Sequence, residues 1–341
     1  MIKNKSKGII NSAENKLPDE EIFSNIKTIT SEEIKCLVST AEAIDTMEIA
    51  FASYSEGKSC VPDRYVSEIP DAGMDLFLKP AYSKALGRIA VKILTQKKGG
   101  ALAGVPAILG VVLLLDMKSG AILSVTDGSY LTALRTGAAS GIATKLLARE
   151  NSETMAVFGC GAQGRTQLEA VCAIRPIKNA LLYDLNRDTV EKMRSEMEKK
   201  LNISIQVEQN LEKLKKADII CTATNAKGPL FGINDISKGV HINAVGSYRP
   251  DMQEIDPEIL LSGSLFTDSG VSVLKESGDL IKPINDGYFS KNIIKGDIGE
   301  VINLKVRGRI DANDITIFKS VGLGVQDLFM ANTIYNKLKR N

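Results

Sequence analysis

The chain has 341 residues, of which 44% are hydrophobic, so it is long enough for about two domains with sizeable cores. Its 43 Lys and Arg residues nearly balance its 41 Asp and Glu residues, and the two signs are mixed along the sequence. This balance argues against nucleic acid or an anionic membrane as the main partner. We therefore expect a globular protein whose main partner is neither nucleic acid nor a membrane.

Targeting and metal-binding signals are absent from the sequence. The N-terminus is polar and rich in lysine, without the apolar core of a signal peptide. The longest apolar run, residues 105–115, has about half the length of a membrane-spanning helix. Five cysteines without a Cys-x-x-Cys pair predict reduced thiols, and the single histidine, His241, excludes a His-rich metal site. We predict a soluble cytoplasmic protein with no bound metal and a structural His241.

The first part of the chain predicts an α+β unit. Thr30 with Glu33, and Ser39 with Glu42, have the spacing of helix capping boxes. Apolar residues recur at helical spacing over residues 41–54. Short extended runs separated by Gly, Pro and Asp then predict an antiparallel sheet with strands over residues 88–95, 107–115 and 121–126.

The second part of the chain alternates predicted strands with predicted helices. Helices are expected around Leu168 and from Val190 to Leu201. The predicted strands cover residues 155–158, 180–184, 203–207, 218–224, 241–245 and 264–268. Strand and helix alternating at this spacing predict a doubly wound parallel sheet.

A dinucleotide-binding fingerprint follows the first of these strands. Gly159, Gly161 and Gly164 form Gly-x-Gly-x-x-Gly, with Ala162 and Gln163 between the last two glycines. The first glycine permits a tight turn, the second lets the backbone approach a pyrophosphate, and the third permits close packing of helix on strand. The N-terminus of the following helix attracts the anion. The pattern predicts that these five residues bind a dinucleotide.

The predicted strand over residues 180–184 ends in Asp184, twenty residues after Gly164. An acid at this place bonds the adenosine ribose hydroxyls and repels a 2′-phosphate, which favours NAD(H). Arg187 follows three residues later and is able to receive a 2′-phosphate, so NADP(H) stays possible. Cys160 lies inside the glycine motif, and we interpret it as a small packing residue.

Three cationic residues stand out before the fingerprint. Arg64 follows Val-Pro-Asp, Lys92 interrupts an apolar strand, and Arg135 lies in a helix of small residues. Each is more often a surface or ion-pairing residue than a ligand group when its spacing is considered alone. We assign these three residues a role only because of the motifs that occur with them, which are described next.

At these residues the sequence resembles the ornithine cyclodeaminase/μ-crystallin family, over nearly the whole chain after the N-terminal extension. Seven elements carry the resemblance and occur in the same order. They lie at residues 62–64 (Pro-Asp-Arg), 91–92 (Val-Lys), 131–140 (with Leu-Thr-Ala-Leu-Arg-Thr-Gly), 159–164, 243–251 (with Gly-Ser-Tyr-Arg-Pro-Asp), 298–302 and 318–327 (Phe-Lys-Ser-Val-Gly-Leu-Gly-Val-Gln-Asp).

The resemblance implies a Rossmann domain inserted into an α+β domain that binds substrate and dimerises. The implied division is an extension at residues 1–28, whose role stays open, a substrate-binding and dimerisation domain at 29–133 plus 318–341, and a Rossmann NAD(P)-binding domain at 134–317. In the family, the sheet of the first domain pairs with a second subunit, so a homodimer is expected.

The resemblance also assigns roles to individual residues. Arg64, Lys92 and Arg135 would clamp the carboxylate of a small imino or amino acid, a task that suits planar guanidinium groups. The nicotinamide side would be lined by Thr222, Thr224, Val245 and Gly246 and closed by Lys319 and Ser320.

Tyr248 separates two branches of this family. Cyclodeaminases and related alanine dehydrogenases carry an acidic residue where this sequence has Tyr248. Tyrosine is a poor base near neutral pH, and Asp251, three positions further on, is an imperfect substitute. The Arg-Pro-Asp that follows Tyr248 is similar to the ketimine-reductase branch.

We therefore predict NAD(P)H-dependent reduction of cyclic imino acids, Δ1-pyrroline-2-carboxylate or Δ1-piperideine-2-carboxylate, to proline or pipecolate. Lys92 or a water would supply the proton to the imine. Three alternatives stay open at this stage. They are ornithine cyclodeaminase, which forms L-proline and ammonia from L-ornithine, an alanine-type amino-acid dehydrogenase, and a non-catalytic protein that binds a nucleotide.

Overall fold

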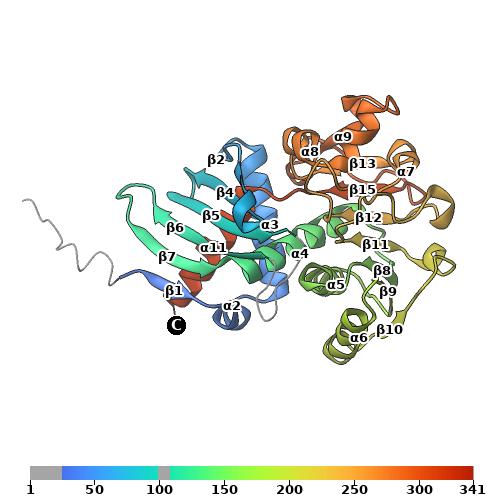
Figure 1. Ribbon diagram of the computed structural model, residues 1–341, viewed down its shortest axis with the longest axis horizontal. Helices are drawn as coiled ribbons and strands as arrows, with labels where there is room; N and C mark the ends of the chain where they lie inside the picture. Colours follow the sequence, from blue (N-terminus) through green and yellow to red (C-terminus); the bar gives the residue numbers. More distant parts are fainter. Residues whose placement is uncertain (1–24, 99–107, 341) are drawn as a thin grey trace, which may run out of the picture.

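Two β-sheets organise the computed structural model, which describes residues 25–98 and 108–340 (Figure 1). The sheets lie at opposite ends of the molecule, and the long helix α4, Gly128–Leu147, runs between them. Residues 1–24 of the predicted extension and residues 99–107, which include the first residue of one predicted strand, lie outside the described residues.

The first sheet is mixed and mainly antiparallel. Among the described residues it has seven strands, in the order β1-β7-β6-β5-β4-β2, with β3 also paired to β4. Only β1 and β7 are parallel neighbours. The strands are β1 Lys27–Ile29, β2 Ser59–Cys60, β3 Tyr65–Ile69, β4 Met74–Ser83, β5 Arg88–Lys97, β6 Ile108–Asp116 and β7 Ile122–Asp127. Since β1 belongs to this sheet, the end of the predicted extension is part of the fold.

Helices cover one face of the first sheet. They are α2 Ser31–Leu37, α3 Thr40–Ser55, α4 and α11 Gly324–Leu338. Both predicted capping boxes are confirmed, since Thr30 and Ser39 each bond the helix that follows. The core between sheet and helices includes Ala90 and Val112 from the strands, and Phe51 and Leu328 from the helices. The strands alternate buried with half-buried residues because successive side chains point to opposite faces.

Strand β4 was not predicted as a separate strand, although it is ten residues long. Pro80 in its middle lacks the N–H that a central strand uses for pairing. The structure tolerates this proline because β3 pairs only with residues up to Leu78 and β2 only from Tyr82 onward. The chain between β2 and β3, which includes Arg64, therefore passes beside the middle of β4.

The second sheet is entirely parallel and has the order β10-β9-β8-β11-β12-β15-β13-β14 among the described residues. The strands are β8 Thr154–Phe158, β9 Asn179–Tyr183, β10 Ser204–Val207, β11 Ile219–Thr222, β12 His241–Ala244, β13 Ser264–Thr267, β14 Ile294–Asp297 and β15 Thr316–Lys319. The predicted strands of this sheet are confirmed to within two residues at each end, whereas β14 and β15 were not predicted as strands.

Helices pack on both faces of the parallel sheet. They are α5 Ala162–Ile174, α6 Arg187–Leu201, α7 Pro257–Ser262, α8 Gly270–Glu276, α9 Gly278–Asn285 and α10 Ile298–Ile302. Short 3₁₀ helices occur at Pro70–Ala72, Leu214–Lys216, Ile233–Asp235 and Lys291–Ile293. The predicted fold class, a doubly wound parallel sheet joined to an α+β unit, is confirmed.

The chain crosses between the two sheets twice. It leaves the first sheet through α4 and returns after β15, the last strand in sequence, which lies in the middle of the parallel sheet. The predicted domain boundaries at residues 133/134 and 317/318 fall inside α4 and inside β15. The division into domains stays a prediction.

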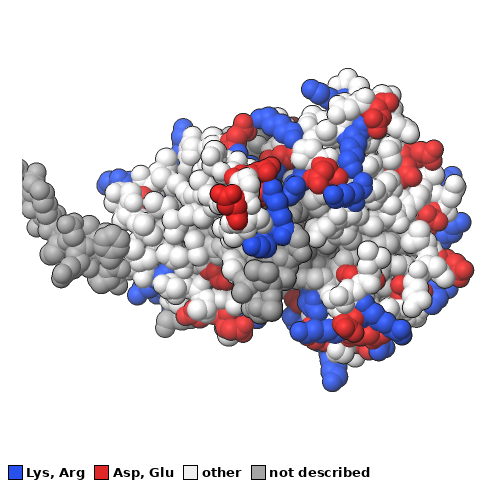
Figure 2. Space-filling view, in the orientation of Figure 1, with Lys and Arg blue, Asp and Glu red and all other residues white. Residues whose placement is uncertain are grey.

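Figure 2 shows that, on the face drawn there, Lys and Arg lie among Asp and Glu without a large area of one sign. Among the described residues, none of the helices is both long and apolar enough to span a bilayer.

His241 is fully buried in β12 and lines neither of the two cavities described below. Its Nδ1 lies 3.0 Å from Thr316 Oγ1, and its Nε2 lies 3.2 Å from Asn243 Oδ1. Burial lowers its pKa to about 3, and nearby Arg309 adds to the effect.

This burial predicts a pH-dependent loss of stability. The unfolded chain gains a proton on His241 near pH 6.5 but the folded chain does not, so the free energy of unfolding falls as the pH drops below about 6.5. At pH 5 the loss from this residue is roughly 2 kcal/mol. Urea denaturation at pH 8, 6 and 5 should show a shallower decline for His241→Gln than for the wild type. Equal declines in the two proteins would contradict the assignment.

Candidate active site

A cavity of about 880 Å³ lies between the two sheets. Its walls come from β4, β5 and α4 on one side, and from the loops after β8, β11, β12 and β15 on the other. Parallel sheets bind ligands outside the carboxyl ends of their strands, where the strand order reverses. Here the order reverses between β8 and β11, and the loops after both strands line the cavity.

The glycine loop has the geometry that the sequence predicted. Gly159 has φ +93°, and a Cβ there would lie 2.5 Å from the carbonyl oxygen of Ala223. A Cβ on Gly164 would lie 1.9 Å from the carbonyl oxygen of Gly159, so this glycine permits close packing of α5 on the turn. A Cβ on Gly161 would meet no atom within 4 Å. The second glycine therefore faces open space.

The start of α5 is suited to an anion. No side chain caps its first turn, so N–H groups there stay available, and these are the groups that bind phosphates at helix N-termini. Gly161, Ala162 and Gln163 line the cavity. Together with the open space at Gly161, these features fit a dinucleotide pyrophosphate.

Asp184 lies directly after β9, beside the glycine loop rather than in the cavity wall. Its carboxylate accepts the N–H of Cys160 at 2.7 Å and the N–H of Asn186 at 2.9 Å. Arg187, the first residue of α6, is exposed. Burial raises the pKa of Cys160 to about 12, so this thiol is neutral, in agreement with a packing role.

The three predicted cations converge on one wall of the cavity, although they come from three different elements. Lys92 Nζ lies 2.8 Å from Asp327 Oδ2 and 2.9 Å from Oδ1, and Arg135 Nε lies 3.0 Å from Oδ1. Arg64 forms an ion pair with Glu276 and donates to the carbonyl oxygen of Tyr248 at 3.0 Å.

Asp327 is the carboxylate that balances this wall. Burial raises its pKa, but Lys92, Arg135 and Lys79 outweigh that effect and leave the pKa below its usual value. Burial lowers the pKa of Lys92 to about 8, and Asp327 limits the decrease. Asp327 is the last residue of the motif at residues 318–327, but the sequence alone assigned it no role. The sequence did contain a signal for this role, since Asp327 is an acidic residue among the apolar residues that form α11.

Lys79 is a fourth cation that sequence reasoning missed. It lies directly opposite Lys92 in the antiparallel pairing of β4 with β5, lines the same cavity and is nine-tenths buried. Its Nζ donates to the carbonyl oxygen of Gly322 at 3.3 Å. Burial lowers its pKa well below the ordinary value, and Arg64, Lys92 and Arg135 lower it further. Every second residue of β4 is buried, and Lys79 is one of these residues. It was not recognised because that strand was not predicted.

A buried glutamate shapes the nicotinamide side of the site. Glu254 accepts the Thr222 hydroxyl at 2.8 Å, the Thr224 N–H and hydroxyl at 2.7 and 2.8 Å, and the Gly246 N–H at 2.8 Å. It thus ties together the carboxyl ends of β11 and β12. Of the predicted nicotinamide residues, Thr224, Gly246 and Val245 line the cavity, while Thr222 is buried behind it.

Lys319 and Ser320, the predicted closing residues, are both engaged with buried acids. Lys319 forms a 2.9 Å ion pair with Asp279 and does not line the cavity. Asp279 also accepts the N–H of Glu254 at 2.6 Å. Lys319 therefore helps to position Glu254 through Asp279. Ser320 lines the cavity, and its hydroxyl donates to Asp268 at 2.7 Å.

Tyr248 also lines the cavity, and the side-chain amide of Gln96 donates to its hydroxyl at 2.6 Å. Among the described residues that line the cavity, Asp127 is the only acid, and its carboxylate caps the start of α4. Asp251 pairs with Arg249 on the surface instead. Where the structure is described, no group of three or more His, Cys, Asp or Glu residues is placed to hold a metal ion.

The model of the ornithine cyclodeaminase/mu-crystallin family matches residues 25–341. This match spans nearly the whole chain. The chain belongs to the ornithine cyclodeaminase/μ-crystallin family. The resemblance predicted from the seven sequence elements is therefore confirmed.

Proteins similar to this chain include two reductases and a dehydrogenase. The chain is 35% identical, over 91% of its length and 95% of the relative, to a Δ1-pyrroline-2-carboxylate reductase of Bacillus thuringiensis subsp. konkukian. It is similar to the structure of Thermococcus litoralis Δ1-pyrroline-2-carboxylate reductase in complex with NADH and L-proline, with a TM-score of 0.89, 37% identity, and 92% and 98% of the two chains covered. An archaeal alanine dehydrogenase dimer with bound NAD has a TM-score of 0.86, 33% identity, and 93% and 97% coverage.

Two glycine substitutions distinguish cofactor binding from folding. Gly161→Ala should leave the melting temperature unchanged, because the methyl group meets no atom of the protein, but weaken NADH binding by about tenfold or more. Gly164→Ala should instead lower stability by about 1–3 kcal/mol, because its methyl group overlaps Gly159. Thermal melting and fluorescence titration with NADH measure the two effects. Full NADH affinity in Gly161→Ala would contradict the placement.

Proposed function

We propose that this protein reduces cyclic imino acids with NADH, converting Δ1-pyrroline-2-carboxylate or Δ1-piperideine-2-carboxylate to proline or pipecolate. The observation that carries the proposal is the shared cavity, in which Arg64, Lys92 and Arg135 lie on one wall and the glycine loop on another. The two similar reductases support the same reaction, and one of them was determined with NADH and L-proline.

The cationic wall binds the substrate carboxylate. Arg135 and Lys92 are held in place by Asp327, so little side-chain freedom is lost when a carboxylate arrives. Phe77 and Leu94 line the same cavity and provide an apolar surface for the ring. A planar carboxylate joined to a small apolar ring therefore matches the chemistry of this wall.

NADH is the favoured cofactor. Asp184 lies where the adenosine ribose would pass, and a carboxylate there accepts hydroxyl groups but repels a 2′-phosphate. Exposed Arg187 keeps NADPH possible as a second cofactor. When bound, the cofactor supplies the hydride that adds to the imine carbon.

The protein contributes position and charge. Glu254 fixes the strand ends that carry Thr224 and Gly246, which sets the wall against which the nicotinamide packs. The cations fix the substrate carboxylate at the opposite wall, so the imine carbon faces the cofactor. Holding both reactants in one orientation removes much of the entropic cost of the reaction.

The other candidate activities fit the cavity less well. Cyclodeamination needs an acid near the substrate amines, whereas Tyr248 occupies that place and the only acid of the described lining is the helix cap Asp127. An amino-acid dehydrogenase needs ammonia as a second substrate. Because the chain is similar to an archaeal alanine dehydrogenase, this activity is the one to assay beside the reductase activity. A binding protein without activity has no need of several buried cations on one wall.

We further propose a homodimer. One face of the first sheet is covered by helices, while the opposite face carries half-buried apolar residues on its central strands, including Leu78, Val91, Ile93 and Leu113. The similar archaeal alanine dehydrogenase was determined as a dimer. A second copy would cover this apolar face. Location in the cytoplasm remains a prediction.

Loss of NADH absorbance tests the reaction directly. With purified protein and Δ1-pyrroline-2-carboxylate, absorbance should fall without added ammonia. Parallel assays with pyruvate plus ammonia, and with ornithine at constant NADH, test the dehydrogenase and cyclodeaminase activities. The proposal is wrong if the imino acid leaves NADH unchanged while either parallel assay forms product.

Arg135→Met tests the carboxylate clamp. The variant should lower kcat/KM for the imino acid by about 100-fold or more, because the carboxylate loses a buried guanidinium. Its affinity for NADH should stay within about twofold of the wild type. Arg88→Met is the matched control, since Arg88 pairs with Asp116 where β5 begins and β6 ends, and it does not line the cavity. Equal activities of the two variants would exclude Arg135 from the clamp.

A further inference from the structure

Lys79 and Lys92 differ in their partners, although they face each other across β4 and β5. Lys92 Nζ contacts both oxygens of Asp327 and donates to the Thr132 hydroxyl at 3.2 Å. Lys79 Nζ has one hydrogen bond, 3.3 Å long, to the carbonyl oxygen of Gly322, and forms no ion pair among the described residues. A carboxylate partner stabilises an ammonium group, so Lys92 holds its proton more firmly than Lys79.

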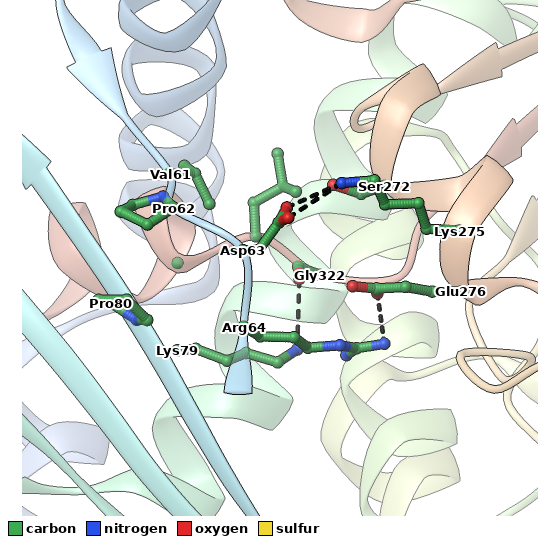
Figure 3. A pocket seen from close by; sticks show the side chains of 12 residues that line it. Val61, Pro62, Asp63, Arg64, Lys79, Pro80, Ser272, Lys275, Glu276 and Gly322 are labelled. Atoms are coloured by element: carbon green, nitrogen blue, oxygen red, sulfur yellow. Dashed lines mark hydrogen bonds and ion pairs between the residues drawn. The ribbon is translucent and has the colours of Figure 1, made fainter. Parts of the chain in front are cut away.

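Lys79 also lies between two cavities. It lines the large cavity described above and a second, polar cavity of about 30 Å³, which has room for about two water molecules. Figure 3 shows Lys79 beside Arg64, beneath Gly322 and Glu276. The rim of the small cavity carries Asp63 and Lys275, whose side chains are 85% and 55% exposed. The small cavity therefore connects the surface residues Asp63 and Lys275 with Lys79.

We propose that Lys79, rather than Lys92, is the catalytic residue that delivers the proton to the imine nitrogen. The proposal rests on the proposed reductase function. As the hydride reaches the imine carbon, the C=N π electron pair moves to the nitrogen, and this nitrogen takes a proton from Lys79 Nζ. The products are the amino acid, the oxidised cofactor and a neutral Lys79, which regains a proton from the solvent, relayed through water in the small cavity.

The charges around Lys79 make its proton labile. Burial lowers its pKa, and so do the cations that face it, whereas the acids that face it oppose the decrease. The cations are Arg64 after β2, Lys92 on β5 and Arg135 on α4, and the acids are Asp327 on α11 and Glu276 on α8. When a substrate binds, its carboxylate adds a negative charge to the set of charges that face Lys79. Binding should therefore draw a proton onto Lys79, at the place where the reaction consumes it.

Proton uptake on ligand binding tests this without turnover. Pyrrole-2-carboxylate, a planar analogue that cannot be reduced by hydride addition to an imine, is titrated into the NADH-saturated protein at pH 7 in two buffers of different ionisation enthalpy. At that pH Lys92, with a pKa of about 8, already carries its proton. The wild type should take up close to one proton per ligand, and Lys79→Met close to none. Equal uptake in the two proteins, or none in the wild type, would overturn the proposal.

Two variants separate proton delivery from charge. Lys79→Met should lower kcat about 10²- to 10⁴-fold, the usual contribution of a general acid. Lys79→Arg keeps the positive charge but cannot release a proton near neutral pH, so it should show a similar loss in kcat while still binding pyrrole-2-carboxylate. Near wild-type kcat in Lys79→Arg would reduce Lys79 to a binding group and refute proton delivery.

Lys97→Met is the matched control. Lys97 lies on β5, donates to the backbone carbonyl of Ala72, and does not line either cavity. Its kcat and proton uptake should equal those of the wild type. If the wild type reduces no imino acid, the proposed function fails, while the uptake measurement still shows whether Lys79 binds a proton with the ligand.

Discussion

The carboxylate of Asp327 is the interaction on which the cavity depends. Lys92 and Arg135 are both buried against it, and burying either cation without a partner would cost several kcal/mol. The three residues come from β5, α4 and α11, which are far apart in the sequence. The return of the chain after β15, which lays α11 on the first sheet, is therefore needed both for the hydrophobic core and for the charge balance of the site.

A second buried acid serves the other wall in the same way. Glu254 collects hydroxyl and N–H donors from the ends of β11 and β12, and Lys319 and Asp279 support it from behind. Burial raises the pKa of Glu254, and Lys319 opposes the increase. The cofactor wall is thus built by a polar network inside the sheet, while the residues that face the cavity remain free to contact a ligand.

The contrast between Lys79 and Lys92 follows from strand pairing. Antiparallel register places the two lysines opposite each other, so they share a face, a cavity and a field of like charge. Asp327 lies close enough to pair with one of them only. The same residue type can therefore anchor a carboxylate at one position and exchange a proton at the other, because the partner decides how tightly the proton is held.

The sequence by itself determined the local features: both capping boxes, the strands β8 to β13 and the helices α5 and α6 of the parallel sheet, the glycine loop with Asp184, and the family with its three cations. These depend on short-range spacing or on motifs that are contiguous in the chain. Lys79 and the partners Asp327, Glu254 and Glu276 were decided by the tertiary structure. Pro80 disguised β4, so the lysine beside it could not be placed opposite Lys92. Ion pairs between distant elements leave no spacing in the sequence, because they form only when packing brings those elements together.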